Sequence, residues 1–433
     1  MNPYLRLPPI LSTIAVLAFA PVFVSNARAD ERTEAFDQRM LMDTCVKRGS
    51  AEPKQRITAC STVIGAGNLA ASEVALAYLN RATAYRATGE STKAAADYAE
   101  ALRRFDNLAD PQQPAAQIVY QRAVALQALG QIDRAMAAYD EAVRLDPENP
   151  IPLVKRASAL VQHKGELPRA IADFTHALTV SPDNVEALLG RGDAYGRLGD
   201  FDRSFADIDR AIRLAPDDAE AHVMRGLANA RRGNSQSAAT DYDAALAIDP
   251  RNMDALTNRA ALYSMVGQMD KALADLDAAI AIRSNDPLAY FNRGYVQFSR
   301  KKYDQAIADY GTAIDLDPRM ATAYNNRCMT LVLAGRNADA ALADCNKAQE
   351  LAPDDIDVRD TRGFVYLKTG KPELAVAEYN AALKIDPKRA LALYGRGLAR
   401  IRSGDIAGGN ADRDAASSLV PGIGSQFSSY GLQ

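Results

Sequence analysis

The stretch PLAYFNRGYVQFSRKKYDQAIADYGTAIDLDPRM, residues 287–320, contains the pattern that decides the fold. Near its end stands Pro318, and the slot that this proline fills recurs every 34 or 35 residues along the chain. The residues in this slot are Pro216, Pro250, Ser284, Pro318, Pro353, Pro387 and Pro421. Self-similarity at such a period is typical of a repeat array, in which each unit packs against its neighbours rather than around one central core.

Each unit is expected to form two amphipathic helices, because apolar and small side chains recur at helical spacing on both sides of residues 300–302. Small residues stand where two helix backbones must approach closely, at Gly294, Ala306 and Ala313. Pro318 cannot continue a helix, and the residue before a proline is biased towards extended geometry. The second helix of the unit is therefore expected to end there.

This pattern of Gly, Ala, aromatic residue and Pro resembles the tetratricopeptide repeat, and we expect an exported bacterial member of that family. The resemblance covers nearly the whole chain. It implies an all-α fold, a right-handed superhelical solenoid of stacked antiparallel helix pairs. An arginine precedes the small residue of the first helix in ten units: Arg81, Arg122, Arg156, Arg191, Arg225, Arg259, Arg293, Arg327, Arg362 and Arg396.

The repeat phase divides the chain into segments. Residues 30–74 are expected to form a degenerate leading repeat, and residues 75–421 ten tetratricopeptide units. A Pro- and Asp-rich insertion at about 106–114 is expected to be a surface loop. Residues 422–433 are expected to form a capping helix over the last repeat, which a solenoid needs for solubility.

Residues 1–29 have the features of a signal peptide. Arg6 precedes an apolar run, residues 10–24, and Ala27-Arg28-Ala29 forms a small-x-small cleavage signal before Asp30. The alternative is a buried helix or a membrane anchor, although the run is short for a membrane span. We therefore expect a periplasmic or secreted protein, with no integral membrane segment in the mature chain.

The charge balance does not favour a polyanionic partner. The chain has 51 Lys and Arg and 54 Asp and Glu, and removing Arg6 and Arg28 leaves 49 basic and 54 acidic residues, a net charge of −5. This mild acidity gives no electrostatic footprint for nucleic acid or for an anionic membrane. No nucleic-acid partner is expected.

An acidic residue precedes the aromatic slot of the second helix in most units: Asp97, Asp173, Asp207, Asp241, Asp275, Asp309, Asp344, Glu378 and Asp412. Only Ala138 interrupts this series. Because a partly buried arginine needs a carboxylate, we expect each of the recurrent arginines to pair with the acid of its own unit. An anion-binding stripe is the functional alternative, but an internal ladder of ion pairs is preferred because buried charges are almost always paired.

Two groups of residues on the first-helix face are candidates for partner binding. The asparagines Asn258, Asn292 and Asn326 precede three consecutive arginines and resemble the asparagine ladder with which superhelical arrays of this family hold a peptide backbone. Polar filler on the helix surface is the alternative for them. An apolar strip follows: Phe291, Tyr295, Phe298, Met329, Phe364, Tyr394 and Leu398. If exposed, the strip marks a partner site; otherwise it packs between repeats or lies under the C-terminal helix.

The four cysteines fall into two pairs. Cys328 and Cys345 occupy facing slots of one helix pair, and Cys45 and Cys60 have nearly the same relation in the leading repeat. In an oxidising compartment these pairs are expected to be disulfides. The alternative is four buried thiols that act as small apolar groups.

No catalytic constellation is recognisable, so we expect no enzyme activity, no metal and no cofactor. His163, His176 and His222 lie apart and form no metal-ligand motif. The family resemblance implies a protein or peptide partner. The leading hypothesis is an extracytoplasmic interaction module that holds an extended peptide or a partner helix in its concave groove. The alternative is a scaffold or assembly subunit of a cell-envelope or export complex, in which the convex face and loops make the contacts.

Overall fold

The computed structural model describes residues 40–46, 52–67, 69–109 and 115–432. The chain forms two compact units, residues 1–166 and residues 167–433. The predicted signal peptide lies outside the described residues, as do residues 110–114 of the predicted insertion. Within the described ranges the secondary structure is helical, with no strand.

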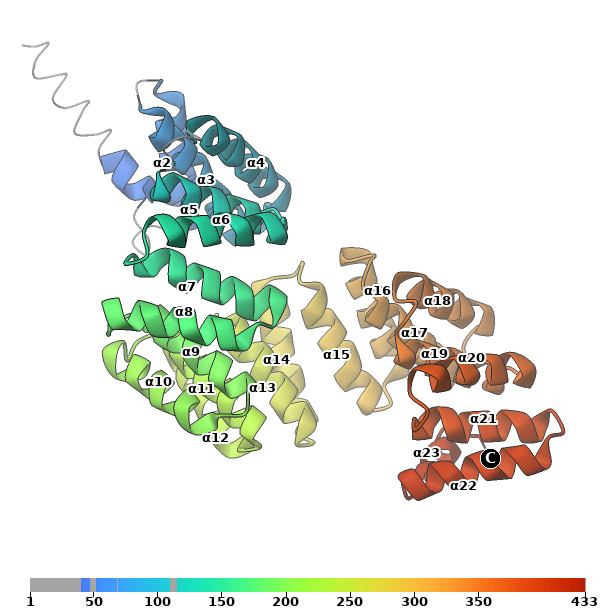
Figure 1. Cartoon of the computed structure of the whole chain (residues 1–433). Coiled ribbons are helices and arrows are strands. Elements are labelled where there is room, and N and C mark those ends of the chain that lie inside the picture. The colour runs from blue at the N-terminus through green and yellow to red at the C-terminus, as the bar shows by residue number, and fades with distance from the viewer. Residues whose placement is uncertain (1–39, 47–51, 68, 110–114, 433) are drawn as a thin grey trace, which may run out of the picture. The chain divides into compact units, whose positions relative to one another are not determined.

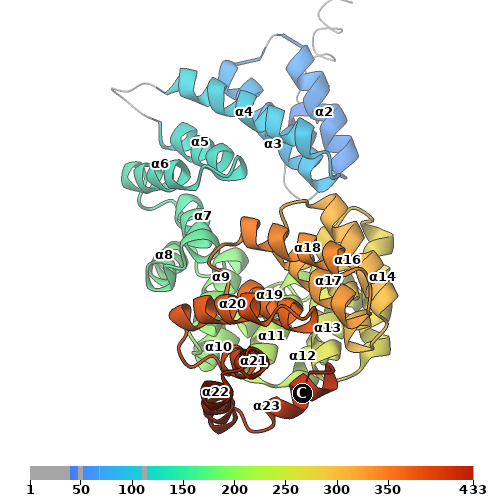
Figure 2. The same cartoon turned by 90° about the vertical axis from the view of Figure 1, so that its right-hand side faces the viewer.

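The first unit contains a helical segment at residues 40–46 and then successive helices that pack as neighbours. These helices are α2 (Pro53–Gly65), α3 (Ala71–Ala87), α4 (Ser91–Leu108), α5 (Ala116–Ala128), α6 (Ile132–Leu145) and α7 (Pro150–Ala159). Helix α3 pairs with α4 and α5 pairs with α6, as Figures 1 and 2 show.

The second unit begins with α8 (Leu167–Val180) and continues as a regular series of helix pairs. The pairs are α9 (Val185–Arg197) and α10 (Phe201–Leu214), α11 (Ala219–Arg232) and α12 (Ser235–Ile248), α13 (Met253–Met265) and α14 (Met269–Ile282), α15 (Pro287–Ser299) and α16 (Tyr303–Leu316), α17 (Ala321–Leu333) and α18 (Ala338–Leu351), α19 (Ile356–Lys368) and α20 (Pro372–Ile385), and α21 (Ala390–Arg402) and α22 (Ile406–Leu419). A short helix, α23 (Ile423–Ser429), follows. The predicted all-α solenoid of stacked helix pairs is confirmed.

The contact between a glycine and an aromatic ring explains why the two helices of a pair can approach so closely. A Cβ atom added to Gly294 on α15 would lie 2.9 Å from the Tyr310 ring on α16. The same contact joins Gly226 to Tyr242. Because real Cβ atoms do not approach other atoms so closely, these positions require glycine, and the tyrosines that they accommodate are fully buried.

The predicted ladder of ion pairs is present: in most helix pairs, an arginine of the first helix binds an acidic residue of the second helix of the same pair. Bonds of 2.6 or 2.7 Å join Arg81 to Asp97, Arg191 to Asp207, Arg225 to Asp241, Arg259 to Asp275, Arg293 to Asp309, Arg327 to Asp344, and Arg396 to Asp412. These aspartates are only 4–8 % exposed. The pair Arg362–Glu378, in which glutamate replaces aspartate, is longer, at 3.4 Å.

Most of these arginines also reach into the preceding repeat, a contact that sequence reasoning missed. The Arg259 guanidinium donates to Asp243 on α12 and the Arg293 guanidinium to Asp277 on α14. Arg122, whose own unit has Ala138 in the acidic slot, instead pairs with Asp106 of the unit before it. The arginines that make both contacts, such as Arg259 and Arg293, therefore tie their repeat to the preceding one as well as their own two helices to each other.

The first helices of the second unit line the inner side of the stack. From α9 to α21, each first helix contacts the first helix of the next pair, whereas successive second helices make no comparable contacts. Closer spacing on one side is what a curved stack requires. The surface formed by α9, α11, α13, α15, α17, α19 and α21 is called the inner face below.

Candidate functional site

The first half of the apolar strip is partly open to solvent. Tyr295 on α15 is 51 % exposed, and Phe291, Phe298 and Met329 are half-buried. The Phe291 ring packs at 5.7 Å from the Tyr310 ring, and the Phe298 ring lies 5.9 Å from the Tyr303 ring. These four side chains form a surface on α15 and α17. Ring contacts with the second helix of the pair hold Phe291 and Phe298 in place, and Tyr295 is open to solvent.

The second half of the strip is buried. Phe364 on α19 is 5 % exposed, and Tyr394 and Leu398 on α21 are 6 % and 2 % exposed. The expectation that these three residues line an open surface is therefore wrong in this structure. They belong to one apolar cluster that includes Phe427 of α23.

Helix α23 is the element that covers them. Its Phe427 ring lies 4.9 Å from the Tyr394 ring and 6.3 Å from the Phe364 ring. The Tyr430 ring, just after the helix, meets Phe364 edge-on at 5.8 Å. The Lys368 ammonium on α19 donates to the Tyr430 carbonyl oxygen at 2.9 Å. The C-terminal segment therefore reaches back along the inner face to α19, beyond the last helix pair.

The three asparagines lie in the expected place but differ in their surroundings. Asn258, Asn292 and Asn326 are half-buried on α13, α15 and α17. The Asn326 side chain hydrogen-bonds to the hydroxyl of the buried Tyr310, whose pKa is raised above its usual value mainly by burial. Asn326 thus has a structural partner, and its role in binding a peptide backbone stays a prediction, as it does for the other two.

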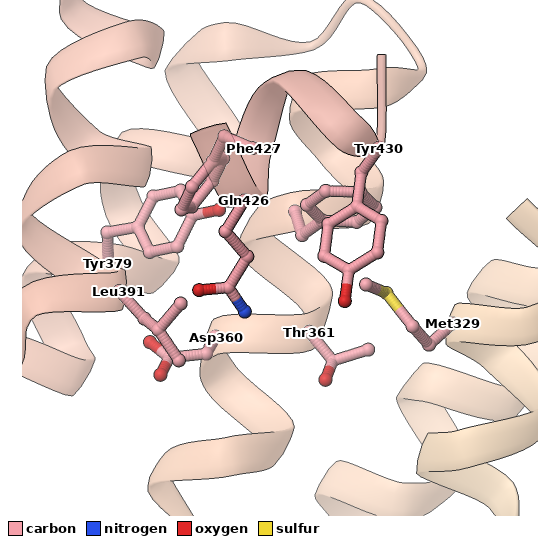
Figure 3. Close-up of a pocket in the computed structure, with 9 residues that line it drawn as sticks. Met329, Asp360, Thr361, Tyr379, Leu391, Gln426, Phe427 and Tyr430 are labelled. Atoms are coloured by element: carbon pink, nitrogen blue, oxygen red, sulfur yellow. The ribbon is translucent and has the colours of Figure 1, made fainter. Parts of the chain in front are cut away.

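A pocket lies where the covered part of the strip begins, with a volume of about 130 Å³. Figure 3 shows its lining, which comes from α17, α19, α20, α21 and the α23 segment. The lining residues are Met329, Asp360, Thr361, Phe364, Tyr379, Leu391, Gln426, Phe427 and Tyr430. Of these, only Met329 and Phe364 belong to the sequence-predicted strip.

Asp360 is the charged group of this pocket, and sequence reasoning missed it. It stands two residues before the recurrent arginine, in a slot that holds Val223, Phe291 and Tyr394 in other units. A carboxylate in a repeat position that is mostly apolar in the other units is the sequence feature that could have identified Asp360 as a candidate site residue. Burial raises the Asp360 pKa to about 6, although a bond of 2.7 Å from Arg389 opposes that shift.

Both predicted cysteine pairs lie at disulfide distance. The sulfur atoms of Cys45 and Cys60 are 2.12 Å apart, and those of Cys328 and Cys345 are 2.07 Å apart. Cys328 and Cys345 fill the slots that hold Gly294 and Tyr310 in the preceding unit. The second disulfide thus replaces the usual glycine–tyrosine contact between the two helices of its pair.

The described residues contain neither a metal-binding cluster nor a membrane-spanning helix. No group of three or more His, Cys, Asp or Glu residues among them has a geometry that could hold a metal ion. In the same ranges, no helix combines the length and the apolar character that crossing a membrane requires.

Sequence profiles of the tetratricopeptide repeat match the chain over most of its length. Profiles described as tetratricopeptide repeat match residues 79–150, 154–219, 189–253, 241–274 and 287–320. A profile described as TPR repeat matches residues 266–299 and 363–404. The chain belongs to the tetratricopeptide repeat family. This family is generally a non-catalytic interaction module whose members bind protein or peptide partners.

Solved structures resemble the chain at low sequence identity. The human IFIT1 dimer with m7Gppp-AAAA is 17 % identical, with a TM-score of 0.50, over 88 % of this chain and 99 % of that one. A tetratricopeptide repeat protein from Parabacteroides merdae is 20 % identical, with a TM-score of 0.46, over 60 % and 99 %. YrrB, a TPR protein with an unusual peptide-binding site, is 22 % identical, with a TM-score of 0.35, over 45 % and 100 %. The first of these likenesses shows a shared fold only. A search of curated proteins gives no match.

Proposed function

We propose that this repeat protein holds a peptide or a partner helix on the open part of its inner face. The binding surface comprises Phe291, Tyr295, Phe298 and Met329, and the asparagines Asn258, Asn292 and Asn326 supply polar contacts to the ligand backbone. The binding is non-covalent, with apolar anchors that give affinity and amide groups that fix the register of the chain.

The observation that carries this proposal is the position of α23. This segment of the same chain already lies on the continuation of the strip and inserts Phe427 between Phe364 and Tyr394. The inner face thus accommodates a short helix through aromatic anchors. The neighbouring surface around Tyr295 is also rich in aromatic residues, and none of the described segments covers it in this way, since Tyr295 is 51 % exposed.

The test compares two exposed apolar residues from one helix pair. A peptide is first selected by display on the immobilised full chain, and its Kd is then measured for Tyr295→Ala and for Leu316→Ala. Leu316 ends α16, the second helix of the pair, and is 39 % exposed. The Tyr295 variant should lose about 2 kcal/mol of binding free energy, roughly thirtyfold in Kd, because a central aromatic anchor is lost.

The control variant Leu316→Ala should bind like the wild-type protein. Circular dichroism must show equal helix content in both variants. If Leu316→Ala weakens binding while Tyr295→Ala does not, the partner uses the outer side of the stack, and the scaffold alternative replaces the groove proposal.

We further propose that the protein works outside the cytoplasm, in the periplasm or as a secreted protein. The two cysteine pairs support this, because disulfides persist in oxidising compartments. Alkylation of the protein from fractionated cells, carried out after unfolding in urea so that buried thiols are accessible, should leave all four cysteines unmodified until a reductant is added. Rapid labelling of Cys328 and Cys345 without reductant would contradict the proposal.

A further inference from the structure

Two residues that line the pocket beneath the α23 segment each have a buried polar atom without a hydrogen-bond partner in the described structure. One is Oδ1 of Asp360, whose side chain enters from α19. The other is the hydroxyl of Tyr379, which enters from α20. Asp360 is 9 % exposed and Tyr379 is 1 % exposed. Leaving a buried polar group without a hydrogen bond destabilises the folded state, so two such groups beside one pocket need an explanation.

A comparison with other repeats explains why the Tyr379 hydroxyl has no partner. In the unit of α15 and α16, the equivalent Tyr310 bonds to Asn326 of the next first helix. The residue that corresponds to Asn326 after Tyr379 is Gly395, which has no side chain to offer. An added Cβ at Gly395 would lie 2.5 Å from the Tyr379 hydroxyl oxygen. The Tyr379 ring occupies the space that a side chain at position 395 would take, so no side chain there can pair with the hydroxyl.

The charges around Asp360 favour a cation. Its Oδ2 accepts a hydrogen bond from Arg389 Nε, and the Arg389 guanidinium also pairs with Asp357. Asp357 and Asp386 are both close enough to Asp360 to disfavour its ionisation. Two carboxylates therefore pair with the one guanidinium of Arg389, and the remaining oxygen of Asp360 needs a hydrogen-bond donor.

The rest of the pocket suits an aliphatic chain. Met329, Leu391 and Phe427 supply apolar walls, and Gln426 and Tyr430 bring polar groups on the α23 side, as Figure 3 shows. We propose that this pocket binds an ammonium group carried on an aliphatic chain. The ammonium donates to Asp360 Oδ1 and to the Tyr379 oxygen, while its methylene groups lie between Met329 and Leu391. The proposal concerns a different site from the open strip around Tyr295 and does not rest on it.

Two sources of such a group share this chemistry, a lysine side chain of a peptide and a free alkylamine. Water is the competing occupant, because a cavity of this size holds several molecules at on the order of 10–15 Å³ each. A bridging water would satisfy both polar atoms but would show no preference for a cationic ligand. The experiment must therefore compare ligands of equal size and different charge.

The experiment uses the full chain and ligand-observed NMR to measure Kd for n-butylammonium and n-butanol. It also uses a capped tripeptide Gly-Lys-Gly and the same peptide with acetylated lysine. We expect n-butylammonium and the lysine peptide to bind about tenfold more tightly than their neutral counterparts, as the loss of a charged hydrogen bond predicts. A tighter Kd for the peptide assigns the source to a peptide, and a tighter Kd for the amine assigns it to a small molecule.

Three variants complete the test. Asp360→Asn keeps the shape and should weaken ammonium binding about tenfold, and Tyr379→Phe should weaken it severalfold. Asp354→Asn is the control, since Asp354 is exposed just before α19 and does not line the pocket; its Kd should stay within about twofold. Equal binding of n-butylammonium and n-butanol, or an unchanged Kd in both Asp360→Asn and Tyr379→Phe, would overturn the proposal and leave water as the occupant.

Discussion

At the residue scale, the recurrent arginine is the residue that joins the repeats. Its guanidinium has two donor edges, and in the unit of α15 and α16 one edge of Arg293 binds Asp309 while the other binds Asp277 of the preceding unit. Asp309 is buried, whereas the Asp277 side chain is 61 % exposed. The ion pair Arg293–Asp309 is therefore stronger than Arg293–Asp277, since screening by water weakens the exposed pair.

Asp360 makes stability depend on pH in the opposite direction from an ordinary paired aspartate. Its pKa in the folded protein is about 6, above the usual 3.8. Between these values the folded state binds the proton that the unfolded state releases. Stability is therefore lost as pH rises from about 4 to about 6, by roughly 3 kcal/mol at most.

Urea unfolding at several pH values checks this prediction. Asp360→Asn has no proton to lose, so the wild-type protein should lose stability relative to this variant across the window from about pH 4 to 6. Asp354→Asn, at an exposed position just before α19, retains Asp360 and should keep the wild-type dependence of stability on pH. A constant difference between the wild-type protein and Asp360→Asn at all these pH values would show that Asp360 is ionised in the folded protein at ordinary pH.

At the element scale, the turn between the two helices of a pair has one conformation throughout the second unit. A glycine with positive φ stands in this turn at Gly199, Gly233, Gly267, Gly335, Gly370 and Gly404. Between α15 and α16 the same place is taken by Lys301, with φ of 60°. A side chain in the left-handed region costs roughly 1–2 kcal/mol, so this turn is strained where the others are not.

Lys301→Gly is therefore expected to stabilise the protein. The gain should be about 1 kcal/mol, because relief of the left-handed strain exceeds the greater entropy of glycine in the unfolded chain. Lys302→Gly is the matched control: Lys302 has a negative φ of −87°, so glycine there should bring no gain. A Tm for Lys301→Gly at or below that of the wild-type protein would contradict the prediction.

The sequence also shows where the regular elements are interrupted. The interval from Arg156 to Arg191 is 35 residues instead of 34. In the first unit, α7 ends in a π-helical turn, Leu160–Lys164, which takes up one residue more per turn than an α-helix. The extra residue was visible in the sequence, but whether it would enter a helix or a loop depends on packing that periodicity does not describe.

At the scale of the whole molecule, the repeat period was enough to predict the fold. It gave the helix pairs, the ion pairs such as Arg293–Asp309, and the pairing of Cys328 with Cys345. These contacts lie within one unit, where slots face each other at a fixed spacing. Contacts between neighbouring repeats depend on the curvature of the stack, which the repeat period does not specify. The bond from Arg293 to Asp277, and the Asp360 pocket, were missed for that reason.

The burial of Phe364 and Tyr394 shows the same limit. The sequence places both residues on the inner face, but only the three-dimensional path of the chain shows that α23 turns back over them. Phe427, which holds α23 in place, is 4 % exposed. The repeat period places it in the slot that holds Tyr290 and Tyr324 in earlier repeats, but that slot does not predict its contacts with Phe364 and Tyr394.

Phe427→Ala tests how much the packing of α23 on Phe364 and Tyr394 stabilises the neighbouring helix pairs. Removing a buried phenylalanine ring costs about 3–5 kcal/mol, and in a solenoid this loss falls on the units that contact the site. Hydrogen exchange measured by mass spectrometry should therefore become faster in α19, α21 and α23, while α9 to α12 keep the wild-type rates. Ser425→Ala, at an exposed position of the same helix, is the control and should leave all rates unchanged. Faster exchange throughout the second unit would mean that it unfolds as one cooperative body. Unchanged exchange in α19 would mean that α23 does not cover Phe364 in solution.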